Sequence, residues 1–343
     1  LVVVCLLSKQ LHTLTSQQGL IDMRFAPNKT PRKKVAADPR IGQTFISRVH
    51  DMAHGGEGVV RHPSGLTVFV SGVWCDELVE VRVKGIKRQL GEGELLTVIE
   101  PSDDRRSPPC KYAVGSPLSG LERACGGCTW QFIAYEAQLL VKQGWVERAY
   151  TRLLERANRG GSGSGAKGQA GDLIEVAPIW GSDEFGYRNR AEFKTDGQSI
   201  GFNAAKSVEL VHVEDCLVLN SQMQQRLGAL HSVASDVAEA PARKKSHKYD
   251  LLAIDDGMAV GEYLRNKRLP FRQGNSEQNK KMRQWLARLL ERLGQCTVLE
   301  LFCGAGNFTE IIAKSGAKRV VASEYAGDAI ERLRERRFVN VEC

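Results

Sequence analysis

The stretch Val298-Leu299-Glu300-Leu301-Phe302-Cys303-Gly304-Ala305-Gly306-Asn307-Phe308-Thr309 predicts a buried strand, a glycine turn and the start of a helix. Glycines at such a turn let a ligand lie against bare backbone and the helix N-terminus, as nucleotide-like cofactors do in doubly wound sheets. Apolar periodicity around it predicts strands at 297–302 and 319–323, with helices from about 308 and about 328. This β-α-β-α order indicates the front half of a parallel sheet.

An acidic residue follows this turn at a spacing that suits a nucleotide. Glu324 lies twenty residues beyond Gly304, at the end of the second predicted strand, where a carboxylate can accept hydrogen bonds from ribose hydroxyls. Thr309 occupies the third glycine position of a GxGxxG pattern, so the loop favours S-adenosylmethionine over a dinucleotide such as NAD. The alternative is that Gly304 and Gly306 only form a tight turn and that Glu324 is a surface residue.

Composition indicates a globular protein with a polyanionic partner. At 343 residues with 42% apolar content the chain is long enough for two or three domains, and 48 Lys and Arg against 40 Asp and Glu give a net charge of +8. The apolar segment at 1–7 is too short to span a bilayer and no signal-peptide pattern follows it. Nine cysteines without a secretory signal indicate thiols and metal ligands in a reducing compartment. We expect a cytoplasmic, monomeric protein without a membrane partner, with residues 1–42 as a disordered or leader segment.

Short alternating runs broken by glycine fill residues 43–101 and predict a small antiparallel barrel. The runs lie at 45–49, 58–61, 66–70, 78–84 and 95–99. In the fourth run the odd-numbered valines are predicted to face the core and the even-numbered charged residues the solvent. Its charged side, with Lys87 and Arg88, indicates an oligonucleotide-binding barrel, although a solvated face explains the same pattern.

A cysteine pair follows the barrel. Cys125-Gly126-Gly127-Cys128 separates two thiols by two glycines, which permit a backbone tight enough to aim both sulfurs at one centre. Cys110 and Cys216 are the natural further ligands, so that four thiolates complete a site. Spacing alone does not separate a tetrahedral zinc site from a [4Fe-4S] cluster, and free buried cysteines are the third alternative.

These cysteines belong to a predicted central β-rich region at 102–260. A helix is expected from about 135 to 156, with strands at 187–193 and in 199–213. The Gly-Ser-rich run at 158–171 predicts a flexible insertion.

A basic run at 240–248 predicts a second, exposed insertion. The final domain is expected at 261–343. Asn275 and Gln278 predict the N-cap and capping box of its first helix, which Gly294 closes.

Together these segments resemble one family, the S-adenosylmethionine-dependent RNA (uracil-C5)-methyltransferases, in particular the bacterial 23S rRNA branch with a TRAM barrel and an iron-sulfur cluster. The resemblance covers residues 43–343. It is carried by Gly55-Gly56-Glu57-Gly58-Val59-Val60 with Val68-Phe69-Val70, by the four cysteines, by Phe271-Arg272-Gln273-Gly274-Asn275 and by the run from Leu301 to Thr309. The implied fold is α/β and multidomain: an OB-like TRAM β-barrel, a central region with an iron-sulfur loop, and a partial Rossmann-like class I methyltransferase domain.

The resemblance also implies ligands. It implies that Cys110, Cys125, Cys128 and Cys216 hold a [4Fe-4S] cluster, which favours iron over zinc. The implied methyl-donor site contains Gln273, Phe302, Asn307 and Glu324, beside Gly304 and Gly306 of the turn. Ribosomal rather than transfer RNA is the implied partner, because the bacterial tRNA branch generally lacks barrel and cluster. One departure is the gap of fourteen residues, 111–124, between the first two cysteines, which is usually much shorter.

The family's reaction adds a cysteine thiolate to C6 of uracil, so that C5 attacks the methyl sulfonium, and a base then removes the C5 proton. The segments that carry this chemistry, Asp-Pro-Pro-Arg and Ser-Cys-Asn-Pro with a following carboxylate, do not occur in the chain. No catalytic residue is therefore assigned, and Cys303 is expected to pack. We expect the intact gene product to methylate RNA and this chain, as a C-terminally truncated form, to be inactive.

Two other classes of protein fit part of the pattern. A non-catalytic RNA-binding module with a structural zinc site of four cysteines would use the barrel and basic loops alone, and would contain zinc without iron. A nicotinamide oxidoreductase is disfavoured by the partial glycine motif.

Overall fold

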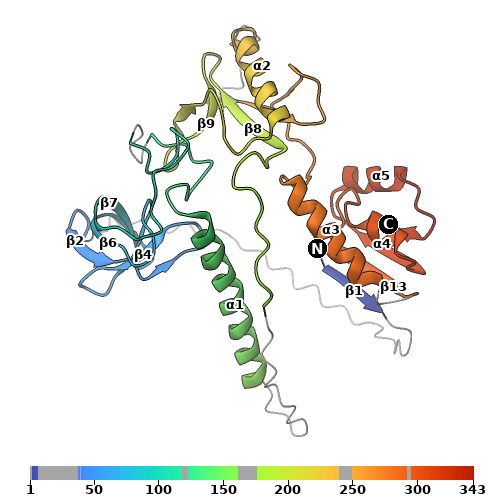
Figure 1. Ribbon diagram of the computed structural model, residues 1–343, viewed down its shortest axis with the longest axis horizontal. Helices are drawn as coiled ribbons and strands as arrows, with labels where there is room; N and C mark the ends of the chain where they lie inside the picture. The colour runs from blue at the N-terminus through green and yellow to red at the C-terminus, as the bar shows by residue number, and fades with distance from the viewer. Residues whose placement is uncertain are drawn as a thin grey trace, which may run out of the picture. The chain divides into compact units, whose positions relative to one another are not determined.

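The structure is a computed structural model that describes residues 2–6, 38, 40–117, 123–160, 176–238, 249–291 and 295–343. It divides into two compact units (Figure 1). One unit is Val35–Lys267, and the other combines Leu1–Lys34 with Arg268–Cys343. The division after Lys267 lies close to the predicted domain boundary at 260.

The first unit begins with a six-stranded sheet in the order β2-β6-β7-β5-β4-β3. Its strands are β2 (Thr44–Arg48), β3 (Asp51–Met52), β4 (Gly58–Arg61), β5 (Thr67–Val70), β6 (Leu78–Lys87) and β7 (Leu90–Glu100). The outermost strands, β2 and β3, follow one another along the chain, and the sheet curls so that Arg61 N of β4 donates to Ser47 Oγ of β2 at 3.3 Å. The five predicted runs are confirmed as strands. The prediction of purely antiparallel pairing is wrong, because β5 and β7, which no hairpin joins, pair in parallel as the sheet curls.

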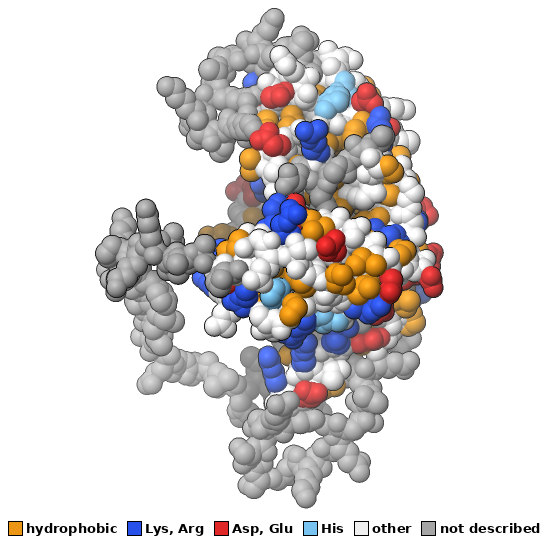
Figure 2. All heavy atoms as spheres, turned by 90° about the vertical axis from the view of Figure 1, so that its left-hand side faces the viewer, with side chains coloured by type: hydrophobic (Ala, Val, Ile, Leu, Met, Phe, Trp, Pro, Cys, Tyr) orange, Lys and Arg blue, Asp and Glu red, His pale blue; other side chains and the backbone are white. Residues whose placement is uncertain are grey.

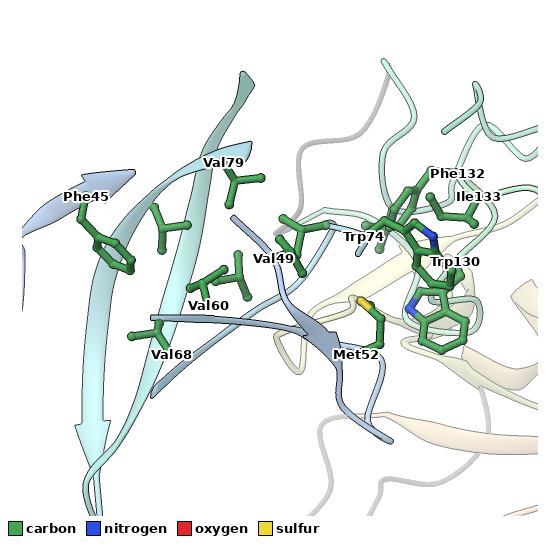
Figure 3. Close-up of a cluster of buried hydrophobic side chains, with 14 of the residues drawn as sticks. Phe45, Val49, Met52, Val60, Val68, Trp74, Val79, Trp130, Phe132 and Ile133 are labelled. Atoms are coloured by element: carbon green, nitrogen blue, oxygen red, sulfur yellow. The ribbon is translucent and has the colours of Figure 1, made fainter. Parts of the chain in front are cut away.

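The curled sheet encloses an apolar core (Figure 3). In β6 the odd-numbered valines are buried while Arg82 and Lys84 are exposed, as the alternation predicted. The core continues into the cysteine loop, since the rings of Trp74 and Trp130 pack edge to face with centroids 5.0 Å apart. Trp130 Nε1 also donates to the carbonyl of Gly56 at 2.9 Å. The loop after the cysteine pair is therefore part of the same packed body as the sheet.

The rest of this unit is a five-stranded sheet in the order β10-β9-β8-β11-β12, with two helices. Its elements are α1 (Tyr135–Gly160), β8 (Arg190–Thr195), β9 (Ile200–Asn203), β10 (Leu210–His212), α2 (Ser221–Ala238), β11 (Asp250–Asp255) and β12 (Leu264–Arg265). Met223, Leu227 and Leu230 of α2 pack with Phe193 and Leu252 in a second core. α2 thereby covers one face of the sheet.

The second unit holds a four-stranded sheet in the order β1-β13-β14-β15. Its elements are β1 (Val2–Leu6), α3 (Ser276–Glu291), β13 (Thr297–Leu301), α4 (Thr309–Lys314), β14 (Arg319–Ser323), α5 (Gly327–Glu335) and β15 (Val341–Glu342). β13, β14 and β15 are parallel, which confirms the predicted β-α-β-α order. Side chains of α3 and α4, including Leu286 and Ile312, pack on Val298 and Val320.

Residues 1–42 differ in part from the expected disordered or leader segment. Val2–Leu6 forms β1, which pairs antiparallel with β13. The reason is that a run of valines has high strand propensity and the edge of β13 offers unpaired backbone groups. Residues 7–37 lie outside the described residues.

Helix ends follow the predicted signals where these lie in the described residues. Asn275 Oδ1 accepts a hydrogen bond from Gln278 N at 2.9 Å, which confirms the N-cap of α3. α1 runs to Gly160, beyond its predicted end at 156. Gly294, the rest of the 158–171 insertion and the 240–248 insertion lie outside the described residues. No helix in the described part of the chain is long and apolar enough to cross a membrane.

Candidate functional site

The turn between β13 and α4 has a backbone that glycine permits. Phe302, Gly304 and Gly306 have φ of 59°, 57° and 88°. A Cβ at Gly306 would lie 2.6 Å from Leu333 Cδ1 of α5, whereas one at Gly304 would meet no atom within 4 Å. Glycine is therefore needed at 306 for the turn to close against α5, and the space above Gly304 is open to a ligand.

Glu324 joins the ends of two parallel strands. It follows β14, and its Oε2 accepts a hydrogen bond from Gly304 N, after β13, at 2.9 Å. Its Oε1 accepts from the amides of Tyr325 and Ala326 at 2.8 and 3.0 Å. The amides of Ala326 and Gly304 lower the pKa of the Glu324 carboxyl. The structure thus places a carboxylate and a glycine turn together at the carboxyl edge of the sheet, where doubly wound folds bind ligands.

Asn307 connects the turn to α3. Its side-chain amide exchanges two hydrogen bonds with Asn279, at 3.1 and 2.8 Å. Arg283, one helical turn later, donates to the carbonyl of Asn307 and, at 3.0 Å, to Glu310 of α4. The predicted site residue is therefore held by a polar network from α3. Asn279 and Arg283 were missed as members of the site, although their i, i+4 spacing places both on one helix face.

Two exposed aromatic side chains lie at the carboxyl edge, and a third lies in the segment before α3. Phe302 and Tyr325 are 71% and 101% exposed, at the ends of β13 and β14. Phe271 is 82% exposed and Gln273 half-buried in the segment before α3. Exposed aromatic rings beside a carboxylate can stack on a planar base whose ribose binds the acid.

Two buried groups lie under the turn. The Glu300 side chain is fully buried in β13, where its Oε2 accepts a hydrogen bond from Thr309 Oγ1 at 2.7 Å. Burial raises the pKa of Glu300 to about 7. Cys303 is 4% exposed and burial raises its pKa to about 12. These properties agree with a packing role for Cys303 and not with a nucleophile, which needs an accessible thiolate.

The four predicted cysteine ligands lie together in the first unit. Each is a free thiol and is partly buried. Burial raises the pKa of Cys216 to about 12, and repulsion from Cys128, Cys125 and Cys110 adds to this effect. Burial likewise raises the pKa of Cys125 to about 11. The structure therefore brings all four sulfurs into one neighbourhood, including Cys110 despite its unusual sequence spacing.

Backbone bonds fix the cysteine pair against the central sheet. Cys125 N donates to Tyr112 O at 2.7 Å, and Gly126 N donates to Asn203 O, at the end of β9, at 2.9 Å. Gly127 N points at the Cys125 sulfur at 3.4 Å. An N–H aimed at sulfur favours the thiolate form that metals bind.

Two glutamines that the sequence did not single out hold the other cysteines. Gln131 Oε1 accepts from Cys110 N at 3.2 Å, and the same side chain hydrogen-bonds to Cys128 and lowers its pKa, against the larger effect of burial. Gln224 of α2 donates to Cys216 O at 2.6 Å. The sequence signals that could have found them were a glutamine three residues after the cysteine pair and another in the helix after Cys216. Such outer partners orient metal ligands.

The cysteine group differs from a single-ion site. Among the described residues, no three His, Cys, Asp or Glu side chains surround one position for a metal ion. A polynuclear cluster spaces its thiolate ligands further apart, because each binds a different iron.

Comparisons with known proteins found one matching family and several similar sequences. Residues 243–336 match the family described as tRNA (Uracil-5-)-methyltransferase. An uncharacterized RNA methyltransferase of Nitrosomonas europaea is 35% identical over 307 residues, 88% of this chain and 72% of that protein. The 23S rRNA (uracil(1939)-C(5))-methyltransferase of Pseudomonas putida is 28% identical over 366 residues, 90% of this chain and 74% of that protein.

A solved structure shares the fold. The Pyrococcus abyssi tRNA (uracil-54, C5)-methyltransferase in complex with S-adenosyl-L-homocysteine has a TM-score of 0.54 at 18% identity, covering 87% of this chain and 79% of that one. Its likeness supports the architecture alone, whereas the Nitrosomonas relative is similar over most of both sequences. On that evidence the chain belongs to the RNA (uracil-C5)-methyltransferase family.

Proposed function

We propose that this protein takes part in methyl transfer from S-adenosylmethionine to C5 of a uridine in 23S rRNA. The observation that carries the proposal is the Glu324 carboxylate bonded to Gly304 N at the carboxyl edge of β13 and β14. That edge offers a carboxylate for ribose hydroxyls, open space above a glycine and exposed aromatic rings. These are the features of an adenosine site without the third glycine of a dinucleotide loop.

The donor would contact residues from three segments of the second unit. Glu324 accepts from the ribose, Phe302 stacks on the donor, and the backbone at Gly304 and Gly306 leaves room for it. Gln273 and Asn307 supply amides for the polar methionine end. The network from α3 positions Asn307, so donor binding depends on α3 as well as on the turn.

Chemistry at uracil C5 requires activation. Addition of a cysteine thiolate to C6 makes C5 nucleophilic, C5 then takes the methyl group, and a base removes the C5 proton as the thiolate leaves. The target uridine must leave its stack to reach the donor. We assign no residue of this chain as nucleophile, since Cys303 is buried under the turn.

The four cysteines are proposed to hold a [4Fe-4S] cluster, which shapes the RNA-binding surface of the central region. Four partly buried thiols, with an N–H aimed at sulfur and two orienting glutamines, fit such a group.

Ribosomal RNA is the proposed substrate. The Pseudomonas relative is named for 23S rRNA and matches nearly the whole chain. The curled sheet presents Arg82 and Lys84 on its outer face, which suits a TRAM-like barrel that binds RNA. Transfer RNA, which the Pyrococcus title names, is the other substrate for the test.

The experiment measures the two binding steps that residues of this chain perform. Calorimetry of the anaerobically purified chain should show S-adenosylhomocysteine binding and no NAD binding. A 23S rRNA fragment should compete effectively against tRNA transcripts in gel-shift assays. NAD binding without S-adenosylhomocysteine binding would overturn the enzyme class, and RNA binding with zinc alone would favour the non-catalytic module.

A further inference from the structure

Residues 146–156 of α1 have no packed face. Residues 146–156 are exposed except for half-buried Leu154. Val146 and Leu153 are 44% and 58% exposed. The first half differs, since Ala137 is buried and Trp145 Nε1 donates to Met52 O of β3 at 2.9 Å. Burial against its own unit therefore does not explain why the helix continues for three more turns.

Three arginines form a stripe along this projecting section. Arg148, Arg152 and Arg156 are spaced by four residues, so they lie on one face with about 6 Å of helix rise between neighbours. Figure 2 shows Lys and Arg side chains gathered in the lower part of the described surface on one face of the molecule. We call Arg148, Arg152 and Arg156 the arginine stripe.

The stripe is poorly neutralised by the protein itself. Arg148 reaches Asp51 of β3 at 3.4 Å, with both side chains about half exposed. In the part of the chain that the structure describes, Arg152 and Arg156 make no ion pair or side-chain hydrogen bond. The nearby acids are Glu147, which bonds to Gln143 at 2.9 Å, and Glu155, which flanks the stripe. Like charges at i, i+4 destabilise an isolated helix, so a bound polyanion would relieve this repulsion.

We infer that the arginine stripe of α1 is a binding surface for the phosphate backbone of RNA. The inference rests on the proposed function, because it assigns part of the RNA contact to residues outside the curled sheet. The rise between the arginines is similar to the spacing of neighbouring phosphates on one RNA strand, so successive guanidiniums can meet successive phosphates. Guanidiniums suit this role because they stay charged and bind phosphate bidentately. Contacts of this kind position the RNA and carry no base specificity.

The test is the double variant R152Q/R156Q in the full chain, bound to a 23S rRNA fragment at several salt concentrations. We expect about tenfold weaker binding at moderate salt, and a salt slope smaller by about 1.4–1.8, for two lost phosphate contacts. The variant R152K/R156K should keep the slope, because charge is retained. Donor binding should be unchanged in both.

A matched control is R288Q/K318Q, which removes two exposed cations from the second unit. It should leave RNA affinity and slope nearly unchanged. An unchanged slope in R152Q/R156Q, while the wild type binds RNA, would overturn the stripe and leave the proposed function standing. Failure of the wild type to bind 23S rRNA would overturn both. An equal loss of RNA affinity in the control would show that the effect comes from net charge alone, and would reject the stripe as a binding surface.

Discussion

The turn between β13 and α4 and the group of four cysteines differ in how fully the protein's own hydrogen bonds satisfy their polar atoms. At the turn every oxygen of Glu324 has a backbone partner and Asn307 is paired with Asn279. In the cysteine group burial raises the pKa of the thiols, and the sulfurs raise one another's pKa further. One site is pre-organised, whereas the other gathers like groups whose charged forms repel.

The difference follows from what each site must bind. The adenosine part of the donor is uncharged and needs hydrogen-bond donors and acceptors already in place, since ordering them on binding would cost free energy. Thiolates need a cation, which reverses the pKa effect of burial and makes repelling ligands attract one centre. We therefore expect the turn to keep its arrangement without a bound ligand, and the cysteine group to depend on a bound cation for its arrangement.

The largest effect should come from the cysteine group. The variant C216S should contain at least about tenfold less iron than the wild type, because the loss of even an outer partner of a metal ligand lowers metal affinity about 10–100-fold. Iron and sulfide analysis after anaerobic purification measures this. The control C75S changes a free cysteine of the first unit outside the group and should keep its iron. Full iron content in C216S would remove Cys216 from the site.

The next effect concerns Glu300 beneath the donor turn. Burial raises its pKa from 4.5 to about 7, so the folded state holds the proton more tightly than the unfolded one. Its stabilising contribution is complete below about pH 4.5 and is lost as pH rises through about 7, a change of roughly 3 kcal/mol. Urea unfolding at about pH 5.5 and about pH 8.5 should show this decrease in the wild type. E300Q should show a flatter profile.

The matched variant for this prediction is T309V, which removes the hydroxyl bonded to Glu300. It leaves the carboxyl in place, so its unfolding free energy should keep the pH dependence. An identical pH profile for E300Q and the wild type would show that Glu300 does not titrate in this range.

A smaller effect is expected at Glu324. E324Q replaces a carboxylate oxygen by an amide that cannot accept from backbone N–H groups. S-adenosylhomocysteine binding should weaken about 10–30-fold, the value of a charged hydrogen bond. Because the pKa of Glu324 is lowered, its carboxylate stays charged as the pH falls toward the ordinary pKa of a glutamate. Wild-type affinity for S-adenosylhomocysteine should therefore persist at that pH. E342Q, which loses the surface ion pair with Arg319, is the control and should bind normally by calorimetry.

The smallest effect on stability should occur at Phe302. Its φ of 59° strains a non-glycine residue and its ring is 71% exposed, so F302G should change the unfolding free energy by no more than about 1 kcal/mol. Donor affinity should fall nonetheless, through loss of the ring. The control F308A truncates a side chain that is 9% exposed and should cost about 3–4 kcal/mol. Strong destabilisation by F302G would make the ring structural.

Local signals predicted most elements correctly. Alternation predicted the burial of the β6 valines, and the glycine turn with flanking apolar runs predicted β13, α4 and β14. α2 was missed because its stripe of Met223, Leu227 and Leu230 is set among glutamine, serine and small residues. β7 is longer than predicted because glycines at 91 and 93 interrupt its alternation.

The sequence by itself determined the residue types of both sites: a glycine turn with an acid twenty residues on, and a spaced cysteine pair. Only the tertiary structure brought Cys110 and Cys216 to that pair and Asn279 to Asn307, because these contacts join segments that no local periodicity relates. It also decided the parallel pairing of β5 with β7 and the unpacked arginine stripe of α1. Local propensity acts within a few residues, whereas burial and pairing depend on where distant segments meet.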